Sequence, residues 1–120
     1  MSRRRTKTFA GVAMLAVAGT FAATALAADF ESRVTIRNGP PAFHGLVKSE
    51  NENCIELRTV KLFKQKNSGN VLKGKDETNA AGRWQVLIDP KSGSYFAKVT
   101  ELTQGNRTCL KDKSRVVTVD

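Results

Sequence analysis

The sequence contains few of the residues from which catalytic and metal sites are usually built. Its 120 residues include one histidine, His44, one tryptophan, Trp84, and two cysteines, Cys54 and Cys109. A single histidine excludes a multi-histidine metal site, and no Gly-x-Ser-x-Gly segment is present to carry a nucleophilic serine. We therefore expect no catalytic residues, no metal, no cofactor and no enzymatic activity.

Long uncharged stretches are missing as well, except at the N terminus. Four basic residues lie within positions 3–7, an uncharged stretch follows over 9–28, and Ala-Leu-Ala occupies 25–27. This three-part pattern predicts a secretory signal peptide over 1–27 and a single mature domain over 28–120. The alternative is an uncleaved anchor, because the uncharged stretch is long enough to cross a bilayer. After cleavage no membrane span remains, and we expect a secreted, extracellular protein.

The net charge depends on this processing. Four of the 20 basic residues and none of the 11 acidic residues lie in the leader, so its removal lowers the net charge from +9 to +5. An exported chain with two cysteines points to an oxidising compartment, and we predict a disulfide between Cys54 and Cys109. The alternative is two free thiols.

Helical periodicity is absent from the mature chain, where apolar residues alternate with polar ones. We interpret residues 54–64 as a central strand with Val60 and Leu62 facing the core, followed by a hairpin turn over 67–70. Trp84 is expected to fill the core. Six further segments have strand patterns, namely residues 32–38, 42–49, 71–77, 83–89, 95–102 and 114–119. About seven short strands in this length predict an all-β, immunoglobulin-like or prealbumin-like antiparallel β-sandwich.

Four segments carry a resemblance to a known family: residues 43–49 (FHGLVKS), 58–64 (RTVKLFK), 78–84 (TNAAGRW) and 93–99 (GSYFAKV). They resemble the carboxypeptidase regulatory-like and transthyretin-like (prealbumin-like) β-sandwich modules, most closely the small secreted actinobacterial type. The resemblance covers most of residues 33–119. It implies a tight turn before the strand that contains Trp84, and it implies a non-catalytic module.

One stretch stands out by its charge. Between positions 58 and 75 there is no acidic residue, and the basic residues are Arg58, Lys61, Lys64, Lys66, Lys73 and Lys75. We interpret these six as a candidate surface for an anionic cell-wall polymer, with another envelope protein as a further candidate partner. Nucleic acid is not favoured, because base stacking needs interleaved aromatic residues and only Phe63 lies in the stretch. The alternative is a lysine-rich edge that discourages aggregation.

The sequence thus predicts a secreted, non-enzymatic binding or accessory module at the cell envelope. The alternative is a small secreted protease inhibitor or other enzyme-modulating protein that presents the exposed loop 50–53. Three acidic residues near this loop, Glu50, Glu52 and Glu56, lack the spacing of a known calcium loop, and we interpret them as a solvated acidic segment.

Overall fold

The computed structural model describes residues 27–120, so the predicted signal peptide, apart from its last residue, lies outside the described residues. The described chain forms twelve strands and one short 3-10 helix. In chain order these are β1 (Ala28–Phe30), β2 (Ser32–Val34), β3 (Arg37–Gly39), β4 (Ala42–Ser49), η1 (Glu52–Cys54), β5 (Thr59–Lys66), β6 (Gly69–Glu77), β7 (Arg83–Leu87), β8 (Gly93–Val99), β9 (Leu102–Gln104), β10 (Arg107–Cys109), β11 (Asp112–Lys113) and β12 (Val117–Val119).

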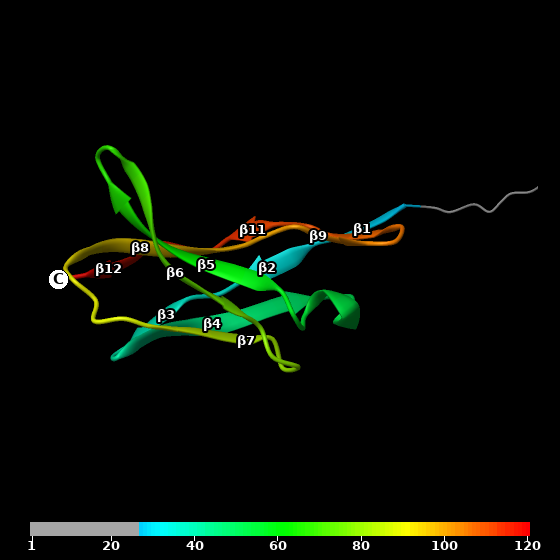
Figure 1. The fold of residues 1–120 in the computed structure, drawn as a ribbon, viewed down its shortest axis with the longest axis horizontal. Coiled ribbons are helices and arrows are strands. Elements are labelled where there is room, and N and C mark those ends of the chain that lie inside the picture. The colour runs from blue at the N-terminus through cyan, green and yellow to red at the C-terminus, as the bar shows by residue number, and fades with distance from the viewer. Residues whose placement is uncertain (1–26) are drawn as a thin grey trace, which may run out of the picture.

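Two larger sheets form the two layers of the molecule (Figure 1). The first, which we call the front sheet, has the order β11-β8-β5-β6, with β12 also paired to β8. The second, the back sheet, has the order β2-β4-β3, with β7 also paired to β4. A small third sheet, β1-β10-β9, contains the parallel pair β1 and β10. The prediction of an all-β fold built from packed antiparallel sheets is therefore confirmed.

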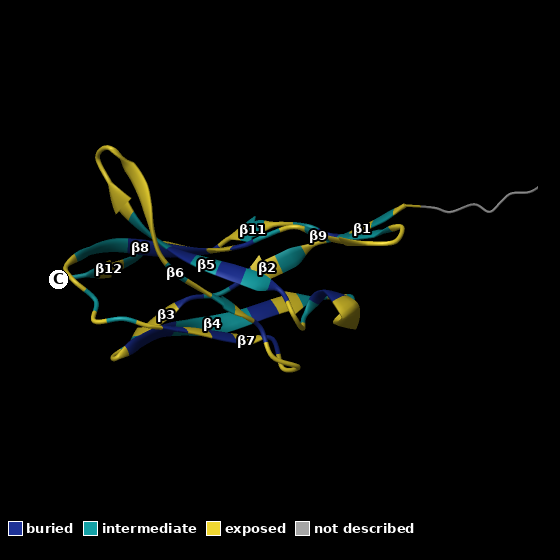
Figure 2. Cartoon of the chain, in the orientation of Figure 1, coloured by how far each residue is buried: buried dark blue, intermediate teal, exposed yellow. Residues whose placement is uncertain are grey.

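The core lies between the two layers, where alternate residues of the long strands face each other. Buried positions on β4, β5 and β8 appear as dark stretches in Figure 2, whereas the tip of the β5–β6 hairpin is exposed. Phe43 of the back sheet meets Tyr95 of the front sheet with ring centroids 4.7 Å apart. The buried cluster consists of Val34, Ile36, Phe43, Val47, Val60, Leu62, Trp84, Val86, Tyr95, Ala97 and Val99.

The central strand was predicted correctly in its facing but not in its start. Val60 and Leu62 are fully buried, as expected from the alternation. The strand begins at Thr59, however, and Cys54 lies in η1. Leu57 has a positive φ of 59°, a left-handed conformation that interrupts an extended chain, so the residues between Cys54 and Thr59 form turns.

The number of strands also exceeds the expected seven, because expected strands are divided and short ones are added. The segment expected over residues 32–38 is divided into β2 and β3, and between them Thr35 donates its backbone N–H to the carbonyl of Leu46 at 2.9 Å. The small sheet adds β1, β9 and β10, which were not predicted. The expected hairpin turn is present, with Gly69 at a φ of 122°.

The predicted disulfide is confirmed. Cys54 and Cys109 are bonded, with Cα atoms 5.5 Å apart, and both are fully buried. The bond ties η1 to β10 and so fastens the small sheet to the rest of the molecule. Among residues 27–120, no helix has the length and apolar character needed to cross a membrane.

Candidate functional site

A row of four lysines crosses the outer face of the front sheet. Lys61 on β5 stands opposite Lys75 on β6 and opposite Lys98 on β8, and Lys98 in turn stands opposite Lys113 on β11. Neighbouring strands lie about 4.8 Å apart, so the row extends over about 14 Å perpendicular to the strands. We call these four residues the lysine row.

The strand alternation places the lysine row on the solvent side. Val60 and Leu62, which flank Lys61 along β5, are fully buried, so Lys61 points to the opposite face. Lys61 is half-buried, and Lys75, Lys98 and Lys113 are exposed. The four lysines therefore form a cationic strip across the outer face of the sheet.

Among the described residues, carboxylates near this strip are not ion-paired with it, although Glu77 follows Lys75 by two residues on the same face of β6 and lines a cavity with it. Within residues 27–120, none of the four lysine side chains forms an ion pair. Asp76 and Asp112, which are next to row lysines in the chain, point inward and accept hydrogen bonds from the backbone N–H groups of Gln85 and Val34, both at 2.9 Å. Like charges placed directly across strands repel each other, so the row has an unfavourable electrostatic energy that a bound anion would lower.

Two aromatic rings border the lysine row. Phe63 of β5 and Phe96 of β8 are cross-strand neighbours and stack with centroids 5.4 Å apart. Phe96 is only 1% exposed, and the Nζ atom of Lys113 lies 4.4 Å from its ring centroid. The rings of Phe63 and Phe96 cover each other, and Lys113 also covers Phe96, so the two rings provide little free aromatic surface for stacking on a ligand.

The structure separates the six basic residues predicted as a binding surface. Lys61 and Lys75 belong to the lysine row, and Lys66 on β5 and Lys73 on β6 are exposed. The hairpin formed by β5 and β6 protrudes from the molecule (Figure 2). Lys64 faces the other side of the sheet, with its Nζ atom 5.7 Å from the ring centroid of Tyr95. Lys73 is the extra residue at a bulge, because Leu62 pairs with Gly74 and Phe63 pairs with Leu72.

The expectation for Arg58 is wrong, because this residue does not reach the surface. Its side chain is fully buried, and its guanidinium group donates to the hydroxyl of Ser32 at 2.8 Å and to the carbonyl of Cys54 at 2.7 Å. It also donates to the carbonyls of Thr100 and Leu110, at 2.8 and 3.1 Å. Burial lowers the pKa of Arg58, because desolvation penalises its charged form.

The sequence pattern missed two members of the lysine row, Lys98 and Lys113. Both lie outside the stretch that was selected for its charge, and β8 and β11 bring them next to Lys61. The alternation around Lys98 indicated that it faces solvent, since its neighbour Val99 is an apolar core residue. The register between β5 and β8 cannot be derived from either strand alone, and it is this register that forms the row.

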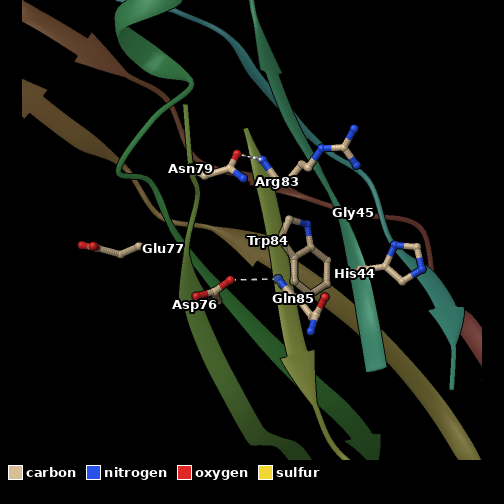
Figure 3. A pocket seen from close by; sticks show the side chains of 8 residues that line it. All are labelled: His44, Gly45, Asp76, Glu77, Asn79, Arg83, Trp84 and Gln85. Atoms are coloured by element: carbon tan, nitrogen blue, oxygen red, sulfur yellow. Dashed lines mark hydrogen bonds between the residues drawn. The ribbon is translucent and has the colours of Figure 1, made fainter. Parts of the chain in front are cut away.

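A polar cavity of about 300 Å³ beside β7 is lined by His44 together with Asp76 and Glu77. Figure 3 shows that β7 passes between His44 and Asp76 and that the side chain of Glu77 points away from both. Asp76 accepts a hydrogen bond from the backbone N–H of Gln85, at 2.9 Å, rather than from the imidazole. These side chains therefore do not form a hydrogen-bonded acid–base pair.

The remaining residues that the sequence singled out have structural or exposed positions. Trp84 is buried in the core, as predicted, and its indole N–H donates to the carbonyl of Thr35 at 3.1 Å. Glu50, Glu52 and Glu56 are exposed. No cluster of three or more histidine, cysteine or acidic side chains that could hold a metal ion occurs in the part of the chain from residue 27 onward. The loop 50–53 ends in η1, with Asn51 accepting from the N–H of Asn53 at its start.

Comparisons of this chain with protein-family models, with curated proteins and with solved structures found no match. The resemblance to carboxypeptidase regulatory-like and transthyretin-like modules stays a prediction. The functional argument therefore depends on the chemistry of the surface.

Proposed function

We propose that this protein is a secreted, non-enzymatic binding module that attaches to an anionic polymer of the cell envelope through the lysine row. The observation that carries the proposal is the alignment of Lys61, Lys75, Lys98 and Lys113 across four hydrogen-bonded strands. A linear polyanion lying across the strands would meet one lysine-bearing strand about every 4.8 Å.

The charge pattern supports a polymer in preference to a single small anion. The row lies along an exposed sheet surface, so its attraction for one isolated charge is weak and screened by salt. A chain with a charge on each repeat engages several lysines at once and releases the counterions bound along it. Affinity then comes from the number of simultaneous contacts.

The aromatic pair supports a polymer without bases. Single-stranded nucleic acids gain much of their affinity from stacking on exposed rings. Here Phe96 is 1% exposed and the ring of Phe63 stacks on it. We therefore favour a phosphodiester or carboxylate polymer of the envelope over nucleic acid, and an extracellular location agrees with the disulfide between Cys54 and Cys109.

Retention on an anionic matrix and on purified cell walls tests this proposal with two charge-matched variants. Lys61→Gln/Lys98→Gln removes the centre of the lysine row, and Lys66→Gln/Lys73→Gln removes the same charge from the hairpin beside it. We expect the row variant to elute at clearly lower salt than the hairpin variant, because only the row aligns its charges. Equal elution of the two variants would contradict the lysine row as the binding surface.

A further inference from the structure

The back sheet has a cationic cavity of its own, on the face away from the core. It measures about 340 Å³, and its nitrogen-bearing side chains come from three strands. Arg37 is on β3, His44 and Lys48 are on β4, and Arg83 is on β7. We call this site the arginine cavity.

The strand register places these groups around one residue. Arg37 stands opposite His44, and Arg83 stands opposite Leu46. Lys48 is the next residue along β4 on the same face as Leu46, because side chains of a strand alternate between faces. Four polar groups thus surround Leu46, and in Figure 3 the side chain of Arg83 extends from β7 toward β4, the strand that carries His44.

Two glycines of the back sheet allow close approaches beside this cavity. A Cβ atom at Gly39 would lie 2.8 Å from the Nε2 atom of His44, so the imidazole lies across the backbone of β3. A Cβ atom at Gly45 would lie 2.0 Å from the carbonyl oxygen of Thr35, so only glycine allows β4 and the segment between β2 and β3 to approach here. Gly45 lines the cavity beside Leu46.

The side chains of the arginine cavity are available for a ligand. Among the described residues, the guanidinium groups of Arg37 and Arg83 form neither a hydrogen bond nor an ion pair. The residues that line the cavity include no acidic residue. Glu31 and Glu50 line a separate cavity, of about 280 Å³, in which they lie near Arg33 and Lys48.

We propose that the arginine cavity binds a tetrahedral oxyanion, a phosphate or sulfate group carried by a small molecule or by a polymer end. Guanidinium groups donate two parallel hydrogen bonds to oxyanions, and here two arginines that line one cavity come from the strands on either side of β4. A tetrahedral group has oxygens pointing in several directions and can accept from both forks, whereas the two oxygens of a carboxylate lie in one plane. The cavity volume is at the lower end of the range for small-molecule sites.

The test is an amide chemical-shift titration of the protein with inorganic phosphate, inorganic sulfate, acetate and chloride at constant ionic strength. We expect saturable shifts with phosphate and sulfate at the amides of Gly45, Leu46 and Arg83, and only small, linear shifts with acetate and chloride. In Arg37→Gln/Arg83→Gln the phosphate dissociation constant should rise at least about tenfold, because charge-assisted hydrogen bonds are lost. The control Lys91→Gln changes an exposed lysine outside the cavity and should leave it unchanged.

Several outcomes would overturn this proposal. Equal shifts with chloride would indicate general charge screening, and equal affinity for acetate would exclude selectivity for tetrahedral anions. Shifts confined to β5, β6 and β8 would place phosphate on the lysine row instead. The comparison of phosphate, sulfate, acetate and chloride uses the unchanged protein, so it tests the proposal even if Arg37→Gln/Arg83→Gln fails to fold. The lysine row is on the front sheet and the arginine cavity is on the back sheet, so a result that excludes binding at one site does not exclude binding at the other.

Discussion

At the scale of single residues, Arg58 shows why a charged residue in a basic stretch is not automatically a binding residue. Its guanidinium group contacts oxygens from β2, η1 and the segments after β8 and β10. None of these partners is a carboxylate, and the Nε atom has no partner among the described residues. The group therefore acts as a hydrogen-bonding centre that holds four parts of the chain together beside the disulfide.

Replacing Arg58 by lysine should lower the free energy of unfolding by about 2–3 kcal/mol, because one ammonium nitrogen cannot reach the four oxygens that two separate guanidinium nitrogens contact. Urea denaturation measures this loss. Arg33→Lys is the matched control at an exposed position, and it should change stability by less than about 0.5 kcal/mol. Equal effects of the two substitutions would show that the buried hydrogen bonds contribute little.

At the scale of elements, the lysine row is a property of strand pairing rather than of any one strand. β5, β6, β8 and β11 each contribute one lysine, and the hydrogen-bond register aligns them. Cross-strand like charges are destabilising, and the effect weakens as salt screens it. The row should therefore carry a measurable cost in the free protein.

Neutralising one member of the row should stabilise the fold. We expect Lys98→Gln to raise the free energy of unfolding by about 0.3–0.5 kcal/mol at low ionic strength, because Lys98 has lysines on both sides. The gain should disappear in about 1 M salt, where the screening length is near 3 Å. Denaturation curves at both salt concentrations check this, with Lys91→Gln as the control. A loss of stability at low salt would contradict mutual repulsion in the row.

The strands also show which features of the fold could be predicted from the sequence. Alternation identified β4 with its bounds, and it identified the inward positions Val60, Leu62 and Trp84, because burial on one face fixes a period of two. It did not reveal the partners of Lys61, because cross-strand register depends on turn geometry and packing far away in the chain. It also gave Arg58 the wrong environment, since a buried arginine and an exposed one have the same local pattern. The arginine cavity was not predicted either, because its residues come from three strands whose cross-strand register the sequence does not give.

At the scale of the whole molecule, one disulfide connects parts that the two main sheets do not hold together. Cys54 and Cys109 are 55 residues apart in the sequence, and β10, which contains Cys109, pairs with β1 and β9 rather than with the main sheets. The bond restricts the unfolded chain and links the small sheet to η1. Much of the stability of a domain of this size is expected to depend on such a bond.

Removing the bond in Cys54→Ala/Cys109→Ala should lower the free energy of unfolding by about 4 kcal/mol, the chain-entropy value for a loop of this length. Thermal or urea unfolding measures the loss. Hydrogen exchange should show the largest increase at the amides of β1, β9 and β10, because these strands depend on the bond for their attachment. Uniform exchange changes across both main sheets would contradict that local role.

The account as a whole depends on the lysine row acting as one polyanion-binding surface. The most direct measurement is the affinity for poly(glycerol phosphate) as a function of salt, for the unchanged protein, Lys61→Gln/Lys98→Gln and Lys66→Gln/Lys73→Gln. Each engaged lysine contributes about 0.7 to the slope of log affinity against log salt for a single-stranded polyanion. The account predicts that the slope falls by about 1.4 in the row variant and by much less in the hairpin variant. Equal slopes for the two variants, or a larger fall in the hairpin variant, would contradict it.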